Sequence, residues 1–439
     1  MTNNMLRVLL LGLVAEATAR PPAVEIFVDP EGGDDDALGE VSSPLRTVHA
    51  ARESVLRMLA SNPARDVTVQ LMPGVHSVGS RPLALTSAES GRDGGVVTWR
   101  SHDPSLPAVV GAPIKVQGWK AHATIPGAMT APLPVNITRG TALRQLWVNG
   151  KRAQRTRVYG HGRQQGDNRM GYCHNLTNST PTDLYPAGSA YDFSGENSTD
   201  PGSWPNPGDV EFVFTSCDAI NCWIEPRCTV ESVEGKIVKL KQADNSSCYH
   251  RLYYYAQCFT NGKGPGRSLS CKGQQCRGRN PTSIENVGLN ASDNAPGTFY
   301  YDRAAATISY VLREGETIAT LEATATTATQ QELVTLTGAS NVRWEGVHFA
   351  YATWLDASGP KGYIDTQSGY QCQAVANSQD GEPATNIAIS GSVNITVVSC
   401  AFSHLGAVYA LGADGASQSI IVSNCTFDDL SGGAVKLGK

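Results

Sequence analysis

Charged residues make up only 17% of the 439 positions and aromatic residues only 7%. Helical bundles need many Glu, Lys and Leu residues, so this composition, with its 44 glycines, favours an all-β protein. The formal net charge of −5 offers no basic surface for nucleic acid or for an anionic membrane. Beyond the first residues, no apolar run approaches the roughly 18 residues of a membrane span. We therefore expect a soluble mature chain with no nucleic acid and no membrane partner.

Familiar catalytic and cofactor signatures are missing as well. The sequence contains no nucleophile elbow, Walker loop, Rossmann fingerprint or zinc-protease motif. An acidic turn at Asp34, Asp35 and Asp36 suggests calcium, but it lacks the ligand spacing of a recognised calcium loop. We expect neither a cofactor nor a metal ion.

The first 19 residues have the pattern of a secretory signal peptide. One basic residue, Arg7, precedes an apolar run over residues 8–14, and the small-residue triplet Ala17-Thr18-Ala19 follows. The alternative is a fraying N-terminal strand or a wrongly assigned start site. We expect cleavage near Ala19 and a secreted, extracellular protein.

Glycosylation sequons and clustered cysteines favour the same location. The predicted glycosylation sites are Asn136, Asn175, Asn197, Asn245, Asn290, Asn394 and Asn424. Eight of the 11 cysteines fall in one segment and predict disulfides, with the pairing left open: Cys173, Cys217, Cys222, Cys228, Cys248, Cys258, Cys271 and Cys276. Zinc bound by Cys271 and Cys276 with another pair is less favoured, because four residues rather than two separate them.

The N-terminal region predicts one helix followed by short strands. Residues 42–61 place Pro44 near a helix start and put Val48, Ala51 and Val55 on one apolar face. Short β runs follow, broken by Gly and Pro at intervals of roughly 10 to 20 residues. Strands this short must stack on neighbours to bury apolar surface.

The C-terminal region contains an internal repeat. The segments NVRWEGVHF, NITVVSCAF and SIIVSNCTF end at Phe349, Phe402 and Phe427 and place apolar side chains at equivalent inward positions. The last two phenylalanines are 25 residues apart, which is the length of one coil of a parallel β-helix. The first two are 53 residues apart, which means two coils or one coil with a long loop. Cys400 and Cys425 are expected inside adjacent coils as small buried side chains.

These patterns divide the chain into four parts. We expect a signal peptide at 1–19, β-helix coils with an N-terminal capping helix at 20–120, an inserted Cys-rich β domain at 121–320, and further coils at 321–439. The inserted segment lacks the regular repeat spacing of the coils and contains the cysteine cluster. We therefore expect disulfides to stabilise it. The last coil stops before completion, and we expect the chain to be a fragment.

Several segments together resemble the right-handed parallel β-helix proteins related to glycoside hydrolase family 141, in the pectin-lyase-like superfamily. They are IFVDPEGGDD with SPLRTVHAAR, LMPGVHSV, LRQLWVNGKRAQRTR, TFYYDRAAATISYVLREGE, ELVTLTGASNVRWEGVHFAYATW and the terminal repeats. The opening motif is common to many β-helix lyases and hydrolases, whereas its combination with LWVNGKRAQRTR is more specific. The resemblance implies a right-handed parallel β-helix.

The resemblance also implies a function. Family members are secreted glycosidases acting on plant or algal polysaccharides, with fucosidase and xylanase activities among them. A polysaccharide or oligosaccharide is then the expected partner, and we expect a monomer. In the family, further coils beyond the length of this chain carry the catalytic carboxylates, so we expect the catalytic pair to be missing here. The cysteine-rich insertion departs from the family's usual pattern.

Glycoside hydrolysis uses two carboxyl groups, about 5 to 5.5 Å apart for retention and about 6.5 to 9.5 Å apart for inversion. Equivalent residues on neighbouring coils stack about 4.8 Å apart, which suits such a pair. The catalytic candidates within the chain are Asp414, Asp429 and His404. Each also fits a structural role, because Asp414-Gly415 is a turn dipeptide and the other two lie at the corner after the repeated Phe.

The loop over residues 352–371 is the stronger candidate for binding substrate. Its aromatic faces suit stacking on sugar rings, and its polar groups suit hydrogen bonds to hydroxyls. The candidates are Trp354, Asp356, Tyr363, Asp365 and Gln367. The alternative is that the aromatic residues only pack this loop against the side of the coils.

A basic strand follows the Asn149-Gly150 pair, which predicts a hairpin turn. Its cations suit an acidic sugar, although a solvated or salt-bridged strand is favoured; they are Lys151, Arg152, Arg155 and Arg157. The leading hypothesis is thus a secreted glycoside hydrolase using paired carboxylates. The alternatives are a polysaccharide lyase of the same architecture and a non-catalytic glycan-binding or cell-surface protein.

Overall fold

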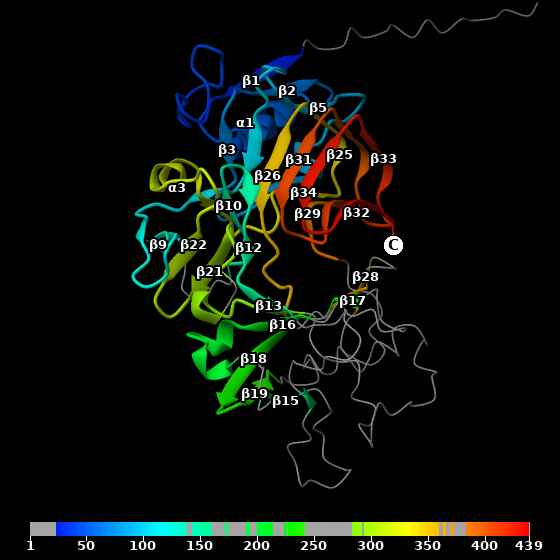
Figure 1. Cartoon of the computed structure of the whole chain (residues 1–439). Helices are drawn as coiled ribbons and strands as arrows, with labels where there is room; N and C mark the ends of the chain where they lie inside the picture. Colours follow the sequence, from blue (N-terminus) through cyan, green and yellow to red (C-terminus); the bar gives the residue numbers. More distant parts are fainter. Residues whose placement is uncertain are drawn as a thin grey trace, which may run out of the picture.

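Figure 1 shows the computed structural model, which describes residues 23–137, 143–159, 172–173, 190–193, 200–213, 224–225, 227–241, 283–291, 294–359, 363–365, 370–372 and 383–438. The described part is mostly β-strand, which confirms the all-β prediction. Its two α-helices are α1 (Val48–Ser61) and α3 (Ile318–Thr324), and short 3₁₀ turns lie at Ser87–Glu89, Pro201–Ser203, Pro207–Asp209 and Leu289–Ala291. The sequence predicted α1 and missed α3.

Helix α1 begins where two side chains satisfy its first backbone N–H groups. The Thr47 hydroxyl accepts a hydrogen bond from the backbone N–H of Ala50. The acidic turn before the helix supports this start, because the Asp35 carboxylate accepts hydrogen bonds from the backbone N–H groups of Arg46 and Thr47. The predicted apolar face, including Val55, is buried in the main hydrophobic core. The acidic turn therefore anchors a helix.

Three parallel sheets form the larger part of the structure. The first contains β1 (Val24–Val28), β2 (Val67–Leu71), β5 (Val97–Ser101), β25 (Ser340–Glu345), β30 (Val393–Val398) and β33 (Gln418–Ser423). The second contains β3 (Val75–Ser77), β6 (Val109–Gly111), β26 (His348–Ala352), β31 (Ala401–Leu405) and β34 (Thr426–Leu430). The third contains β4 (Leu83–Thr86), β24 (Val334–Thr337), β29 (Thr385–Ser390), β32 (Tyr409–Ala413) and β35 (Gly433–Leu437).

From β24 onward the chain gives one strand to each parallel sheet in a fixed order. The rounds β24–β25–β26, β29–β30–β31 and β32–β33–β34 follow one another, and β35 begins the next. Because β25 pairs directly with β30 and β26 with β31, the 53-residue spacing is one repeat with a long loop. The sequence had left that choice open.

Stacked side chains fill the space between the three sheets. Phe402 lies in register with both Phe349 and Phe427, with ring centroids 5.2 and 4.7 Å apart. The inward positions expected from the repeats are confirmed by this register and by their burial in one core. Cys400 is buried within it and Cys425 is partly buried, and both are free thiols.

Two assemblies, antiparallel except for one parallel strand pair in the first, lie between β6 and β24 in the chain. One contains β7 (Ile114–Lys115), β8 (Lys120–Ala121), β9 (Ala128–Pro132), β10 (Leu146–Val148), β11 (Lys151–Arg152), β12 (Gln154–Arg155), β21 (Thr298–Asp302), β22 (Thr307–Val311) and β23 (Thr326–Thr327). The other contains β13 (Arg157–Tyr159), β14 (Tyr172–Cys173), β15 (Ala190–Asp192), β16 (Glu211–Val213), β18 (Arg227–Glu234), β19 (Ile237–Leu240) and β20 (Ser283–Glu285). Each has its own hydrophobic core.

A small third antiparallel sheet joins β17 (Ile224–Glu225) to β27 (Tyr363–Asp365) and β28 (Tyr370–Cys372). The predicted hairpin at Asn149 and Gly150 is confirmed. The turn joins β10 to β11, and both residues have the positive φ angles, 51° and 68°, that such a two-residue turn requires.

The predicted export features fall largely outside the described residues. The signal peptide at 1–19 lies there, as do Asn175, Asn197 and Asn245, whereas Asn136, Asn290, Asn394 and Asn424 are exposed. Cys228 is buried and disulfide-bonded. The side chains of the other predicted disulfide cysteines lie outside the described part, so the pairing stays a prediction. Among the described residues, no helix is both long enough and apolar enough to cross a membrane.

Candidate functional site

His404 and Asp429 meet at the far ends of two neighbouring parallel strands. They occupy equivalent places in successive repeats, because Ser403 pairs with Asp428 and Leu405 with Leu430 on either side of them. Their side chains form a hydrogen bond of 2.7 Å between His404 Nδ1 and Asp429 Oδ2. Two of the three catalytic candidates predicted from the sequence therefore lie in contact.

The backbone at these positions departs from regular β-strand conformation, so their side chains do not follow the usual alternation. His404 and Asp429 have positive φ angles of 55° and 45°, and Tyr351, the equivalent residue one repeat earlier, has 61°. Such a conformation is uncommon for residues other than glycine, and it interrupts the alternation of inward and outward side chains. As a result, Tyr351, His404 and Asp429 form a column that crosses the second parallel sheet near the C-terminal ends of its strands.

The β10–β11 hairpin closes over this column and holds the Asp429 carboxylate. Trp147 Nε1 donates to Asp429 Oδ2 at 2.9 Å, and Arg152 Nε donates to Oδ1 at 2.7 Å. Arg152 also donates to the backbone carbonyls of Leu405 and Asp429. Burial raises the pKa of the Asp429 carboxyl, but the hydrogen bonds from His404 and Arg152 outweigh burial and lower it to about 2. Asp429 is therefore an anion at neutral pH.

The His404 imidazole lies between aromatic rings and its carboxylate partner. Its ring centroid is 5.1 Å from that of Tyr351 and 5.8 Å from that of Trp147. The contact with Asp429 occupies Nδ1, while Nε2 has no partner among the described residues. This arrangement fixes which nitrogen faces the carboxylate and leaves the other one able to exchange a proton. We call Trp147, Arg152, Tyr351, His404 and Asp429 the His404 cluster.

Asp414 lies elsewhere, after strand β32 of the third parallel sheet. Its carboxylate accepts hydrogen bonds from the Ser390 hydroxyl, from the backbone N–H groups of Gly391 and Ala416, and from Ser417. Burial raises the pKa of Asp414, but these hydrogen bonds outweigh burial and lower it to about 2. Asp414 thus ties one turn to the preceding repeat, as its turn dipeptide suggested, and it does not join His404 and Asp429.

The structure does not gather the predicted substrate-binding residues into one site. Trp354 and Asp356 follow β26 and are half-buried, and the backbone N–H of Gly359 donates to the Asp356 carbonyl. Tyr363 and Asp365 belong to β27, but their side chains lie outside the described part, as does all of Gln367. Substrate binding by this loop stays a prediction.

The sequence had not singled out Tyr351 or Trp147. Tyr351 was detectable, because aligning the repeats on Phe places Phe349, Phe402 and Phe427 two residues before Tyr351, His404 and Asp429. Trp147 was not, because it lies 282 residues from Asp429. The favoured interpretation of Arg152, a cation in a salt-bridged strand, agrees with its ion pair with Asp429.

A second group of charged side chains is buried where the two antiparallel assemblies meet. Glu211 forms ion pairs with Arg144, with Arg155 at 2.6 Å and with Arg227 at 3.6 Å, and it accepts a hydrogen bond of 2.7 Å from Ser358. Burial raises the pKa of Glu211, but the arginines, Arg144 first, outweigh burial and hold it well below its usual range. Every cation and carboxylate named here is paired, so this cluster has the character of a structural joint.

No group of three or more His, Cys, Asp or Glu residues in the described part has the arrangement of a metal site. No protein-family model matches this chain, and no curated protein matches its sequence.

Solved structures that match this chain include two glycan-related ones. One, described as "Glycoside hydrolase", has a TM-score of 0.69 at 20% identity and covers 94% of this chain and 67% of its own. Another, "The complex structure of XylC with xylose", has a TM-score of only 0.37 at 10% identity, covers 93% of this chain and 54% of its own, and supports no conclusion. The first likeness shows that this chain has a fold like that of a glycoside hydrolase structure.

Proposed function

We propose that this protein is a carbohydrate-active enzyme of glycoside hydrolase type, related to family 141 and acting on a plant or algal cell-wall polysaccharide. The observation that carries the proposal is the structural likeness to a glycoside hydrolase across 94% of the chain. The repeated order in which the chain visits the three parallel sheets supports a right-handed parallel β-helix. Secretion, glycosylation, a disulfide-clamped insertion and a monomeric state belong to the same proposal.

The His404 cluster contains our candidate for one of the reacting groups. Hydrolysis of a glycosidic bond requires a group that donates a proton to the leaving oxygen. It also requires either a base that activates water or a nucleophile that attacks the anomeric carbon. Asp429 cannot donate a proton at neutral pH, because its pKa is about 2. We assign the exchanging proton to His404 Nε2, with Asp429 as the positioning residue that orients the imidazole through Nδ1. The second reacting group that hydrolysis requires, a base or a nucleophile, lies outside this cluster. The resemblance places a catalytic carboxylate pair in further coils, and His404 is our candidate for a reacting group within this chain.

A reducing-sugar assay tests the class of reaction. The purified protein is incubated with fucosylated polysaccharides, xylans and a polyuronate, and both new reducing ends and unsaturated uronates are measured. A hydrolase releases reducing ends without unsaturated products. Binding to these polysaccharides without any cleavage would instead identify a glycan-binding protein, and the absence of both would contradict a carbohydrate function altogether.

A polysaccharide lyase is the second candidate. It is favoured by one observation, namely that the His404 cluster combines one ionised carboxylate with a histidine instead of two carboxylates. β-Elimination needs a base beside a uronate and does not need a second carboxyl group. Cleavage accompanied by absorbance from unsaturated uronates would establish the lyase and exclude the hydrolase.

A further inference from the structure

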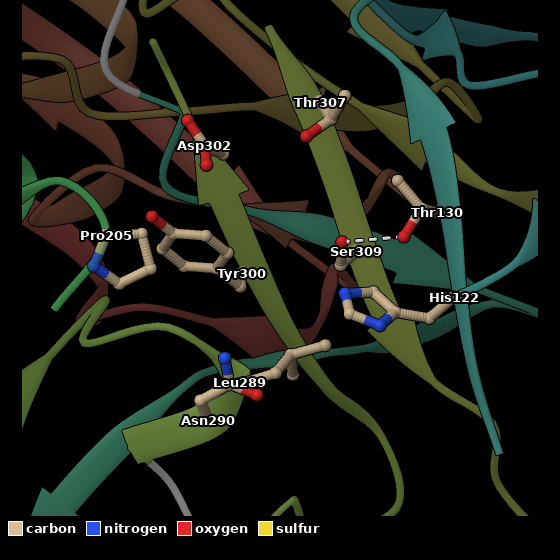
Figure 2. A pocket seen from close by; sticks show the side chains of 9 residues that line it. All are labelled: His122, Thr130, Pro205, Leu289, Asn290, Tyr300, Asp302, Thr307 and Ser309. Atoms are coloured by element: carbon tan, nitrogen blue, oxygen red, sulfur yellow. Dashed lines mark hydrogen bonds between the residues drawn. The ribbon is translucent and has the colours of Figure 1, made fainter. Parts of the chain in front are cut away.

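A separate cavity of about 160 Å³, with both polar and apolar lining residues, lies over the sheet that contains β9, β21 and β22 (Figure 2). It shares no residue with the His404 cluster. Three residues paired across neighbouring strands form the floor of the cavity. Ser309 pairs with Tyr300 on one side and with Thr130 on the other. The neighbouring pair, Asp302 and Thr307, lies two residues further along the same strands and therefore faces the same side.

The opposite face of this sheet explains why one side can be polar. Phe299, Tyr301, Ile308 and Tyr310 alternate with the cavity residues and are buried in the core beneath. Above the sheet, Leu289 packs with Tyr300 in a small apolar cluster at one end of the cavity. The cavity therefore has an apolar end and a wall of hydroxyl and carboxylate groups.

The polar groups are already oriented by their neighbours. The Asn206 amide donates to the Tyr300 hydroxyl at 2.9 Å and to Asp302 Oδ1 at 2.5 Å. The Tyr300 hydroxyl accepts that bond and keeps its own proton to donate, while Asp302 Oδ2 remains an acceptor. Ser309 and Thr130 hydroxyls lie 2.9 Å apart and retain further donor and acceptor capacity. Groups able to donate and groups able to accept hydrogen bonds are thus both present among the residues shown in Figure 2.

We infer that this cavity binds one neutral sugar residue, as a second carbohydrate site independent of the His404 cluster. A sugar ring offers hydroxyls to the donors and acceptors of the cavity and its C–H face to the apolar end. The volume is below the roughly 300 to 1,000 Å³ of pockets for larger ligands, so it suits one ring. Among the lining residues, Asp302 is a carboxylate, His122 is the one residue that can carry a positive charge, and none is Lys or Arg, which disfavours uronates and sulfated sugars.

Asn290 links this site to glycosylation. It lines the cavity, is exposed, and begins the sequon Asn290-Ala291-Ser292. A glycan attached there would lie beside the cavity and compete with a free sugar. The binding experiment therefore uses protein made in a host without N-glycosylation. A second preparation from a glycosylating host carries Ser292→Ala, which removes the sequon and keeps the Asn290 amide.

The test is ligand-observed NMR with xylose, fucose, galactose and galacturonate as probes. We expect millimolar binding of at least one neutral sugar and weaker binding of galacturonate. Thr307→Ala should weaken binding about fivefold, and Asp302→Asn about tenfold or more, as expected for lost neutral and charge-assisted hydrogen bonds. Thr335→Ala, at a half-buried strand threonine of the third parallel sheet, is the matched control and should leave binding unchanged.

Three results would overturn this inference. They are no binding of any neutral sugar to the unglycosylated protein, preferred binding of galacturonate, and binding that survives both cavity substitutions in variants that keep the parent's melting temperature. Cleavage of polysaccharide does not enter the measurement. Failure of the hydrolase proposal and failure of this site are therefore distinguished.

Discussion

Three side chains from distant parts of the sequence hold the Asp429 carboxylate. Trp147 and Arg152 reach it from the β10–β11 hairpin, and His404 reaches it from the preceding repeat. The sequence singled out His404 and Asp429 because both follow the repeated Phe. It did not predict their partners, because a contact across 282 residues leaves no local pattern.

At the residue scale, Asp429→Asn should lower the free energy of unfolding in a pH-dependent way. The folded-state pKa of about 2 lies below the ordinary value of 3.8, so the carboxylate stabilises the folded protein above about pH 4. This contribution, about 2 kcal/mol for a shift of this size, is lost as the pH falls toward 2. Urea unfolding between pH 2 and 7 should show the wild-type and variant curves converging at acid pH.

Asp428→Asn, at the exposed neighbouring position, is the matched control. It should change the free energy of unfolding by less than about 0.5 kcal/mol throughout this range. A constant difference between wild type and Asp429→Asn down to pH 2 would show that the ionised form of Asp429 is not the stabilising one.

At the scale of elements, the repeat was predictable because its inward residues recur at fixed spacing. The phenylalanine column and the small Cys400 position follow directly from that alignment. Helix α3 was not predictable in the same way, because Ile318–Thr324 is only seven residues long and contains Ile and two Thr. Its start depends on a local capping arrangement in which the Thr317 hydroxyl accepts from the Thr320 backbone.

Phe402→Ala should destabilise the stacked repeats strongly. Phe402 is buried between two other rings, so truncation leaves a cavity and removes both contacts. A loss of about 3 to 5 kcal/mol is expected in chemical denaturation. Ile421→Ala, at a half-exposed position of β33, should cost less than about 1 kcal/mol. Equal losses for the two variants would contradict the assignment of Phe402 to the shared core.

At the scale of the whole molecule, the segment that lacks the regular repeat spacing in its sequence is the segment that forms antiparallel sheets. The antiparallel part begins at strand β7 and ends at strand β23, and the inserted domain at 121–320 stays a prediction. The buried joint around Glu211 was only partly predictable. The sequence singled out Arg155 in a basic strand, and a salt-bridged strand was favoured, which agrees with its ion pair with Glu211. It did not link Arg155 to Arg144 and Arg227, because these come from separate parts of the chain.

Glu211→Gln should loosen this joint. It leaves Arg144 and Arg155 buried without their main carboxylate, and breaking a buried ion pair in this way costs about 3 to 5 kcal/mol. Thermal unfolding should show a lower melting temperature, with hydrogen exchange rising first in β16 and its neighbours. Glu231→Gln, at an exposed position of β18, should leave both readouts unchanged. Unchanged stability of Glu211→Gln would contradict a structural joint.

The most direct test of the proposed function compares kcat/KM on the preferred polysaccharide for wild type, His404→Gln, Asp429→Asn and Asp414→Asn. General acid–base catalysis by His404 predicts a loss of about 100-fold or more for His404→Gln. Asp429→Asn should also lose activity by lowering kcat more than it changes KM, since Asp429 orients the imidazole. Asp414→Asn removes an equally hydrogen-bonded carboxylate from a distant turn and should retain wild-type activity. Full activity of His404→Gln would contradict the assignment of the reacting group.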